Sequence, residues 1–305
     1  MSTLTEPVAV TIGEVALPAA ALDRLRSRAN NLKMLPAVAT QALQIVEDPD
    51  CGINEFAAVV ERDPSLAAGI LRMANSVVFS SGKPVLNLHQ AVVRLGFRQC
   101  KNLIVTASFS SMMKSMSLEE EWIRETLSQH SFTTALLCLN MNWALNIGFQ
   151  GEEFTGGLIH DIGRLLLATC YSDCFNELDK LEFDEEVGVL AAEQALVETT
   201  HCEIGAWFVA KNALPDQLKS VVRFHHNPEL AEPRSRRFVG LVAACDHMAN
   251  HLQRFEESRG YDPELNPFIA ALEESGIPNL SRRYREIAMT MMEDARKHSI
   301  EMLST

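Results

Sequence analysis

The sequence has little of what marks fibrous, disordered or nucleic-acid-binding proteins. Its 305 residues include 15 glycines and 12 prolines, too few for a collagen-like or low-complexity chain. Acidic residues outnumber lysine and arginine by 40 to 27, so the net charge is -13. This balance excludes a general nucleic-acid binder, which needs a basic face to displace counterions, although it does not exclude a local basic pocket. Hydrophobic residues make up 47% of the chain, which is enough for a globular core.

Segments for export and membrane insertion, and several catalytic motifs, are also missing. No apolar run approaches the roughly 18 residues that span a bilayer, and the N-terminus lacks the basic start and apolar core of a secretion signal. The sequence contains no P-loop, no glycine-rich dinucleotide fingerprint and no GxSxG elbow. Seven scattered cysteines without a CxxC pair suit a reducing compartment better than a disulfide framework. We therefore expect a cytoplasmic protein without membrane association.

Helical periodicity dominates the remaining sequence and predicts an all-α fold. In the first half, Asp63 stands before a proline and predicts a helix start, and the apolar residues that follow share one helical face. In the second half, helices are expected over about 118–146, 152–174 and 185–199. Only residues 8–15 hint at the alternation of a strand.

Two features of the C-terminal part each leave two interpretations open. After a predicted loop or linker over 253–278, the last helix has a methionine-rich apolar face that suits either the core or a dimer contact. This face comprises Tyr284, Ile287, Ala288, Met291, Met292 and Ala295. A small basic cluster forms a solvated loop in one interpretation and captures phosphate or a nucleotide in the other. The cluster consists of Arg234, Arg236 and Arg237.

Histidines and aspartates interrupt the apolar faces of the second half. They occur in the order His130, His160, Asp161, His201, His225, His226 and Asp246. Imidazole and carboxylate ligands together suit one or two divalent ions of Fe, Mn, Zn or Ni, whereas the cysteines are not obvious ligands. Asp161 is placed to bridge two ions, with His160 and Asp161 approaching from adjacent edges of one helix. A hydrogen-bonded polar core without an ion is the alternative.

Seven stretches of the sequence resemble the HD superfamily and, within it, the HDOD (HD-related output domain) proteins of bacterial signalling. They are LKMLPAVATQALQIVEDPD, VVERDPSLAAGILRMANSVVF, LHQAVVRLGF, QHSFTTAL, GGLIHDIGRLLL, THCEIGAWFVAKNALP and VVRFHH. The resemblance implies an all-α domain over residues 30–252, in which an N-terminal helical lobe packs on an HD-like lobe. The implied parts are 1–29 (N-terminal extension), 30–115 (N-terminal lobe), 116–252 (HD-like lobe) and 253–305 (linker and C-terminal amphipathic helix).

The HD-GYP phosphodiesterases, which hydrolyse cyclic di-GMP at a two- or three-metal centre, are similar in the order of these seven residues. By that resemblance, one ion would be held by His130, His160, Asp161 and Asp246. The second ion would be held by Asp161, His201, His225 and His226. Water activated by the metal would attack a phosphorus centre, and both ions would offset charge in the transition state.

Three departures separate this chain from those phosphodiesterases. Their HDxGK motif reads HDIGR here, and Arg164 is able to pair with a phosphate but does not readily transfer a proton. The GYP segment that follows the histidine doublet is missing, and Thr126 stands near the position of the glutamate that supplies a third ion in some relatives. The metal cage is therefore expected to be retained, and the substrate-recognition loop is not.

The resemblance implies a bacterial signal-transduction output or interaction module of the HDOD family with a His/Asp metal centre. The alternative is a metal-dependent phosphohydrolase or phosphodiesterase, with Asp161 and Arg164 as candidate catalytic residues. Signalling proteins are the expected partners in the first case, and a nucleotide or cyclic dinucleotide is the expected ligand in the second. A homodimer is expected if the methionine-rich face is a contact between two copies.

Overall fold

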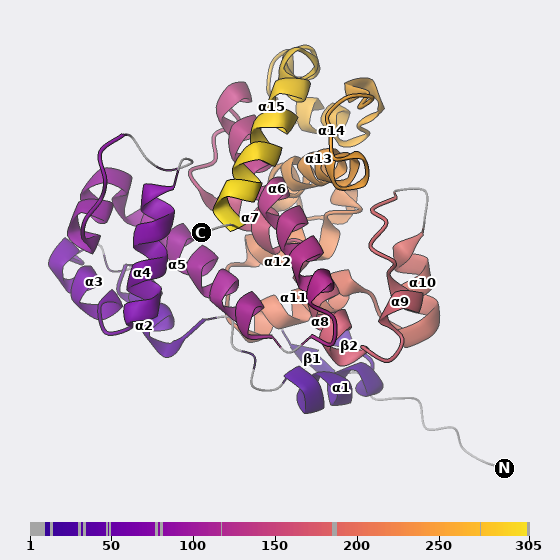
Figure 1. Cartoon of the computed structure of the whole chain (residues 1–305), viewed down its shortest axis with the longest axis horizontal. Helices are drawn as coiled ribbons and strands as arrows, with labels where there is room; N and C mark the ends of the chain where they lie inside the picture. The colour runs from indigo at the N-terminus through magenta and orange to yellow at the C-terminus, as the bar shows by residue number, and fades with distance from the viewer. Residues whose placement is uncertain are drawn as a thin grey trace.

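Helices make up most of the computed structural model, which confirms the all-α prediction (Figure 1). The structure describes residues 10–12, 15–29, 32, 35–46, 48, 50–76, 79, 82–116, 118–184, 188–274 and 276–303. The first half contains β1 (Val10–Ile12), β2 (Val15–Leu17), α1 (Ala19–Ala29), α2 (Ala37–Ile45), α3 (Ile53–Val60), α4 (Pro64–Asn75) and α5 (Leu88–Ser115). The second half contains α6 (Glu121–Leu145), α7 (Glu152–Ile159), α8 (Ile162–Cys170), α9 (Phe175–Leu178), α10 (Val189–Val197), α11 (His201–Lys211), α12 (Asp216–Phe224), η1 (Pro228–Leu230), α13 (Pro233–Phe255), η2 (Pro263–Leu265), α14 (Phe268–Glu274) and α15 (Leu280–Leu303). Over the described residues, every helix is too short or too polar to cross a membrane.

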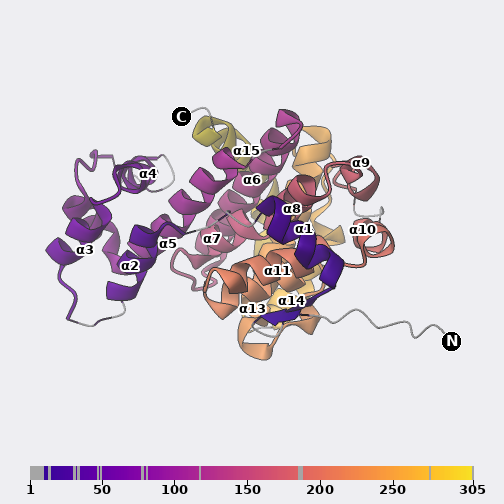
Figure 2. The ribbon, with the colours of Figure 1, turned by 90° about the horizontal axis from the view of Figure 1, so that it is seen from below.

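The N-terminal lobe consists of α2, α3, α4 and the start of α5, and it projects from the rest of the molecule (Figures 1 and 2). Asp63 caps α4 as predicted, because its side chain accepts hydrogen bonds from the backbone N–H groups of Ser65 and Leu66. Within α5, Gly96 adopts φ 78° and ψ 161°, a conformation that favours glycine, and the chain kinks there. The remainder of α5 then packs against α7 of the second lobe.

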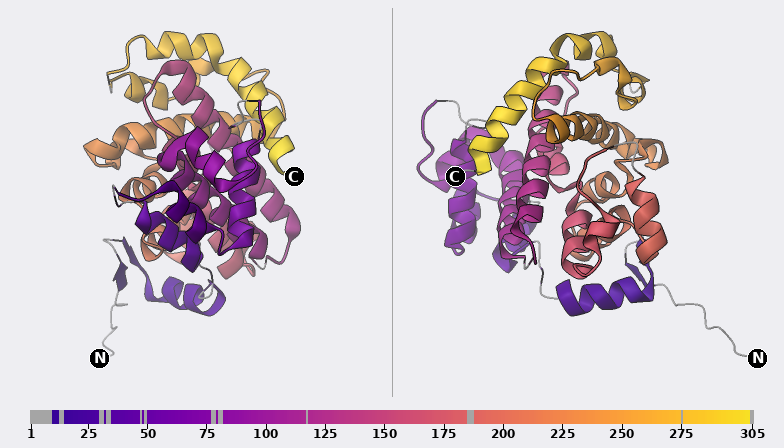
Figure 3. Two further views of the ribbon diagram at one scale, coloured as in Figure 1. Left: turned by 90° about the vertical axis from the view of Figure 1, so that its left-hand side faces the viewer. Right: turned by 45° about the vertical axis from the view of Figure 1, so that its right-hand side comes forward.

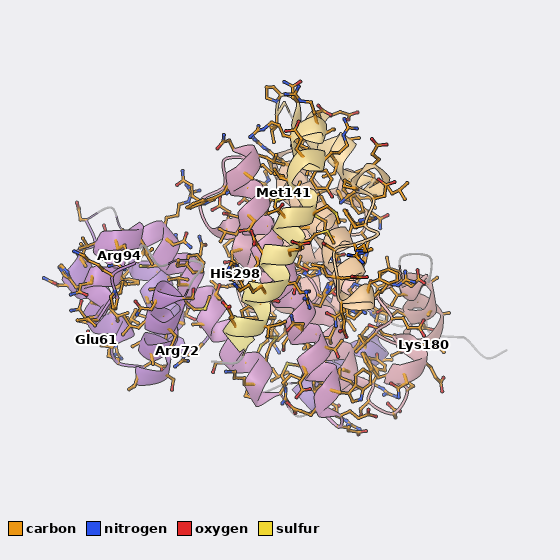
Figure 4. The ribbon with its side chains drawn as sticks, turned by 45° about the horizontal axis from the view of Figure 1, so that its top comes forward. Glu61, Arg72, Arg94, Met141, Lys180 and His298 are labelled. Atoms are coloured by element: carbon orange, nitrogen blue, oxygen red, sulfur yellow. The ribbon has the colours of Figure 1, made fainter. Side chains whose placement is uncertain are left out.

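The HD-like lobe is arranged around α6, which is buried along most of its length. Helices α7, α13 and α15 all pack against α6, and α11 packs against both α8 and α12. The right-hand view of Figure 3 shows α15, in yellow, beside the magenta α6. Figure 4 marks His298 on α15, with Arg94 on the N-terminal lobe and Lys180 near the opposite end of the molecule. The predicted packing of a helical N-terminal lobe on an HD-like lobe is therefore confirmed.

The described residues before position 30 lie against the HD-like lobe. Strands β1 and β2 pair antiparallel, with Val10 opposite Leu17, and β2 packs on α11 while α1 packs on α8. The hint of a strand over 8–15 was therefore partly right: two short strands of a hairpin occur instead of one. Residues 8, 9, 13 and 14 lie outside the described residues.

The single helix expected over 152–174 is wrong. Helix α7 ends at Ile159 and α8 begins at Ile162, and between them Asp161 has φ -100° and ψ 17°, outside the helical range. His160 and Asp161 therefore lie in a turn rather than on adjacent edges of one helix. The turn redirects the chain so that α8 packs against α11, which one straight helix would not allow.

Two expectations for the loops also need correction. The predicted loop over 253–278 contains η2 and α14. The three arginines of the basic cluster lie in the first turns of α13, which starts at a proline, and not in a loop. Arg236 and Arg237 donate hydrogen bonds to backbone carbonyls of neighbouring segments, so both guanidinium groups already have acceptors.

The methionine-rich face of α15 belongs to the core of the chain. Tyr284, Ala288, Met291, Met292 and Ala295 are buried. Beyond this apolar face, Ser299 of α15 accepts a hydrogen bond from Gln129 and another from Thr133, both on α6. The core interpretation is confirmed, and because α6 of the same chain covers this face, it is not available as a dimer contact.

Candidate metal centre

All seven residues predicted as metal ligands meet in one place between six helices. His130 comes from the middle of α6, and Asp246 comes from α13. His160 and Asp161 come from the turn between α7 and α8. His201 is the first residue of α11, and the doublet His225-His226 ends α12. The prediction that distant parts of the chain converge on one polar site is confirmed geometrically; ligation of an ion by these residues stays a prediction.

His130, His160 and Asp246 form the first group. The Nε2 atom of His130 lies 3.0 Å from Asp246 Oδ1, and His160 Nε2 lies 3.3 Å from the same oxygen. The two Nε2 atoms lie 3.3 Å from each other. All three side chains are buried, and their ligand atoms lie within 4.8 Å of one another, a separation that suits an ion between them.

Asp161 stands between the first group and the remaining histidines. Its Oδ2 atom lies 3.7 Å from His130 Nε2 and 3.6 Å from His160 Nε2. Its Oδ1 atom lies 3.5 Å from His201 Nε2 and 3.4 Å from His225 Nε2. One carboxylate thus presents a different oxygen to each side, which is the arrangement of a ligand that bridges two ions.

His201, His225 and His226 form the second group. His201 Nε2 lies 3.2 Å from His226 Nε2. The Nε2 atom of His225 is buried and makes no hydrogen bond among the described residues, although Asp161 Oδ1 lies 3.4 Å away. A buried polar atom without a partner is costly in a folded protein, so this nitrogen indicates a ligand that completes the site.

Hydrogen bonds at the opposite ring nitrogens orient three of these histidines. His160 Nδ1 donates to the carbonyl of Gly157 at 2.7 Å, and His225 Nδ1 donates to the carbonyl of Val222 at 3.1 Å. His201 Nδ1 lies 2.9 Å from a carboxylate oxygen of Glu193. These contacts direct each Nε2 atom into the site, as the outer partners of metal-bound histidines do.

Glu193 is a site residue that the sequence analysis missed. It is fully buried on α10, and its second oxygen accepts a hydrogen bond from the backbone N–H of His201 at 2.8 Å. The available signal was a single acidic residue in the middle of the apolar segment VLAAEQALV, eight residues before His201. A buried carboxylate needs a partner, and here the partner is a candidate ligand.

Close contact between α8 and α11 depends on glycine. A Cβ atom on Gly163 would lie 1.8 Å from the carbonyl oxygen of His201, and one on Gly205 would lie 3.1 Å from the backbone nitrogen of Gly163. The missing side chains let the two backbones touch, and this contact positions His201 beside Asp161.

The electrostatics of the site favour charged carboxylates. Burial would raise the pKa of Asp161, but the neighbouring His160 and Arg164 hold it well below its usual range. Burial would also raise the pKa of Asp246. The hydrogen bonds from His130 and His160 outweigh this effect and hold its pKa well below the usual value. Both carboxylates are therefore ionised at neutral pH and available as ligands.

The pKa values of the histidines in the site shift in different directions. Burial lowers the pKa of His130, His225 and His226, which keeps these imidazoles neutral, the state that binds a metal. For His160, burial is outweighed by Asp161 and Asp246, which raise the pKa. For His201, burial is outweighed by Cys202 and Glu193, and its pKa is raised well above the ordinary value.

Arg164 is fully engaged by two carboxylates. Its Nε and Nη2 atoms donate to the two oxygens of Asp179 at 2.6 and 3.0 Å, and Nη1 donates to Asp161 Oδ2 at 2.9 Å. The ring of Phe183 lies 4.5 Å from the guanidinium carbon and 4.6 Å from the ring of His130. Residues 179–184, here called the strap, therefore cover Arg164 and one side of the centre.

A cavity of about 400 Å³ opens beside the centre, between the strap and α10. Its base includes Asp161, His201, His226 and Asp246. Acidic side chains on its rim are Glu177, Glu182 and Asp184, and Asp184 pairs with Arg254 at 2.9 Å. Among the described lining residues the only lysine or arginine side chains are Lys180 and Arg164, and Arg164 is already paired. Glu177 and Glu182 on the rim, together with Asp161 and Asp246 at the base, repel a multiply charged anion unless cations are bound at the base.

Comparison with known proteins agrees with the fold. The family model of the HDOD domain matches residues 32–228. An HDOD domain protein of unknown function from Geobacter sulfurreducens aligns with a TM-score of 0.75 at 21% identity, over 92% of this chain and 96% of its own. A candidate metal-dependent phosphohydrolase from Shewanella amazonensis aligns with a TM-score of 0.64 at 19% identity, over 92% and 97% of the two chains.

Two further relatives are longer than this chain. A candidate signal transduction protein from Marinobacter aquaeolei aligns with a TM-score of 0.65 at 20% identity, over 93% of this chain and 65% of its own. An uncharacterised protein from Treponema pallidum is 23% identical over 220 residues, which are 72% of this chain. This chain spans 42% of the length of that curated relative. At these identities the solved structures establish a shared fold.

Proposed function

This chain belongs to the HDOD domain family, and from that premise we propose that it is a cytoplasmic signal-transduction output module of a bacterium. In this proposal, divalent ions bound by the His/Asp centre hold the helices of the HD-like lobe in one arrangement. Signalling proteins are then the partners. The domain limits 30–115 and 116–252 are kept as part of the proposal, with 1–29 and 253–305 as additional segments.

The observation that carries the proposal is the position of Asp161 between two groups of imidazoles. The residues fit a metal: the buried Nε2 atom of His225 lacks a partner, and facing nitrogens lie 3.2–3.3 Å apart in both groups. His130, His160, Asp161 and Asp246 would hold one ion, and Asp161, His201, His225 and His226 would hold a second. Such an ion supplies a strong positive charge that links side chains from separate helices.

The surroundings of the centre favour an interaction module over an enzyme that acts on phosphates. Arg164 contacts a candidate ligand directly, but its guanidinium is held by Asp161 and Asp179. The acidic rim adds unfavourable potential for a nucleotide. The name of the Marinobacter aquaeolei relative, a candidate signal transduction protein, agrees with this function.

A metal-dependent phosphohydrolase is the second candidate, and one specific observation favours it. The cavity of about 400 Å³ reaches Asp161, His201 and Asp246, so a small substrate is able to approach the ions. In that case the chemistry supplied by the ions would be activation of water for attack on phosphorus. Asp161 and Arg164 are the candidate catalytic residues, and a nucleotide or cyclic dinucleotide is the candidate substrate.

Elemental analysis of the full chain, purified without chelator, tests the metal centre. We expect more than one Fe, Mn, Zn or Ni ion per chain, because two groups of ligands are present. Asp161→Ala should lower this number to one or less, whereas the control Asp173→Ala, whose carboxylate pairs with Arg24 at the surface, should not change it. A chelator should lower the Tm of the wild type, since a ligand bound only to the folded state stabilises it.

Two results would contradict the proposed function. Metal-free protein whose Tm is unaffected by chelator contradicts the metal centre and supports a hydrogen-bonded polar core. Hydrolysis of bis-p-nitrophenyl phosphate or cyclic di-GMP by the metal-loaded wild type, but not by Asp161→Ala, contradicts the non-catalytic module and supports the phosphohydrolase. We expect neither substrate to be hydrolysed.

A further inference from the structure

We infer that Cys202 is a thiolate ligand of the second metal subsite, which then binds a zinc ion through three imidazoles and one sulfur. The inference rests on the proposed metal centre and concerns only its second group, where the sulfur of Cys202 takes the place of Asp161 as the fourth ligand. Asp161 remains a ligand of the first ion. It assigns a ligand outside the His/Asp set.

The position of the sulfur carries the inference. One ring nitrogen from each of His201, His225 and His226 and the sulfur of Cys202 all lie within 4.8 Å of one another. In a tetrahedral zinc site with Zn–N bonds of about 2.0 Å and one Zn–S bond of about 2.3 Å, neighbouring ligand atoms lie roughly 3.3–3.5 Å apart. The four atoms therefore need only small inward movements to bind one ion.

A second observation indicates that the group accepts a ligand. The Nε2 atom of His225 is buried in this group and has no hydrogen-bond partner among the described residues. The Nδ1 atom of His225 already contacts backbone carbonyls, so Nε2 is the nitrogen left to bind. An ion between His225 and Cys202 would satisfy both atoms.

Opposing effects act on the charge of the Cys202 sulfur. Cys202 is the second residue of α11, and Thr200 caps this helix by accepting a hydrogen bond from the backbone N–H of Glu203. Burial raises the pKa of the Cys202 thiol, whereas the adjacent His201 and the positive end of the helix dipole favour negative charge on the sulfur. Cys202 is 5% exposed, which limits competing reactions with solvent oxidants.

The two subsites would then differ in chemistry. The first group offers imidazole and carboxylate only, which suits Mn or Fe as well as Zn. A sulfur ligand in the second group selects softer ions such as zinc over manganese or magnesium. Four protein ligands also close the coordination shell of a tetrahedral ion, which is typical of structural zinc and agrees with a non-catalytic module.

Cobalt(II) titration of the metal-free full chain tests the assignment, because a cobalt–thiolate bond gives a near-ultraviolet charge-transfer band that a cobalt–imidazole bond lacks. We expect this band in the wild type and in the control Cys174→Ser, whose cysteine lies outside the site. Cys202→Ser should lose the band and bind the second cobalt ion at least about tenfold more weakly, the lower end of what loss of an outer partner costs.

Each outcome separates this inference from the proposed function. Cobalt binding by the wild type without the charge-transfer band overturns the thiolate ligand and leaves the His/Asp centre standing. No cobalt binding overturns both. Persistence of the band in Cys202→Ser also overturns the assignment. X-ray absorption at the zinc edge of the wild type needs no variant: a sulfur atom in the shell supports the inference, and a shell of nitrogen and oxygen alone overturns it.

Discussion

Arg164 shows at the scale of one residue how the surroundings of a side chain change its role. In the HDIGR segment it is a positive group next to a candidate metal ligand, and the sequence suggested contact with a phosphate. In the folded chain it is buried, its three donors point at Asp161 and Asp179, and Phe183 covers its face. Releasing this guanidinium would leave the buried Asp179 without a charge partner, because only the backbone N–H of Leu181 would still donate to it, and this is costly.

Arg164→Lys should therefore destabilise the protein. A lysine keeps the charge but offers one ammonium group, which is unable to reach both carboxylates in the forked geometry of arginine. We expect a loss of about 1.5–3 kcal/mol in the free energy of unfolding, the value of one hydrogen bond to a charged group. Urea unfolding followed by circular dichroism measures it. Arg234→Lys, in an exposed pair with Glu232, is the control and should change stability by less than about 0.5 kcal/mol.

Equal shifts for the two variants would contradict the structural importance of the Arg164 pairs. A gain in hydrolysis of bis-p-nitrophenyl phosphate by Arg164→Lys would show instead that the arginine restrains an enzyme.

At the scale of helices, the centre depends on the contact between α8 and α11. This contact brings His201, at the start of α11, next to Asp161, at the start of α8. Gly163 and Gly205 face each other across it, and the backbone of His201 fills the space where a Cβ of Gly163 would be. Since backbone is unable to yield as a flexible side chain does, the two helices must separate if Gly163 gains a side chain.

Gly163→Ala should lower stability and weaken metal binding together. The Cβ atom would lie 1.8 Å from the carbonyl oxygen of His201, so α11 must shift, at a cost of about 1–3 kcal/mol. The measurements are thermal unfolding and the number of zinc ions retained after dialysis. Gly52→Ala, where a Cβ atom meets nothing within 4 Å, is the control and should retain its metal. Unchanged metal content in a clearly destabilised Gly163→Ala would separate helix packing from the metal centre.

At the scale of the whole molecule, a buried polar cluster ties the C-terminal helices to the HD-like lobe. The hydroxyl groups of Tyr261 and Tyr284 lie 2.8 Å apart, and the side-chain amide of Asn266 donates to both. The same amide donates to the carbonyl of Ala244 on α13. The cluster therefore joins α13, the segment before α14, and α15. Burial raises the pKa of both tyrosines, that of Tyr284 to about 12 from an ordinary value of 10.0.

This cluster predicts a loss of stability at alkaline pH. A group whose folded pKa lies above its unfolded value contributes stability that is complete below the unfolded pKa and is lost as pH rises through the folded pKa. For Tyr284 the window runs from pH 10.0 to about 12 and corresponds to about 2–3 kcal/mol. In Tyr284→Phe the free energy of unfolding should depend less on pH in this window. At pH 7 the variant should lose about 1 kcal/mol of this free energy, because one hydrogen bond is missing.

Unfolding in urea at a series of pH values checks this prediction. The fall in the free energy of unfolding between pH 10 and 12 should be smaller in Tyr284→Phe than in the wild type. A parallel fall in both proteins would place the alkaline sensitivity in other groups.

The helical fold and the seven candidate ligands follow from the sequence, because both depend on local properties. Helical periodicity reflects contacts three and four residues apart, and a histidine or aspartate on an apolar face stands out without knowledge of its neighbours. The break at His160-Asp161 did not follow, since the local apolar pattern continues through it and the packing of α8 on α11 imposes it.

The partners of the centre depend on packing between segments far apart in the chain. Asp179 reaches Arg164 from 15 residues away, Glu193 reaches His201 from another helix, and α6 rather than a second copy covers α15. Cys202 was passed over for the same reason: a lone cysteine has no visible partner until helices bring three imidazoles around it. Such contacts are set by the geometry of turns and helix crossings, and no short-range pattern encodes them.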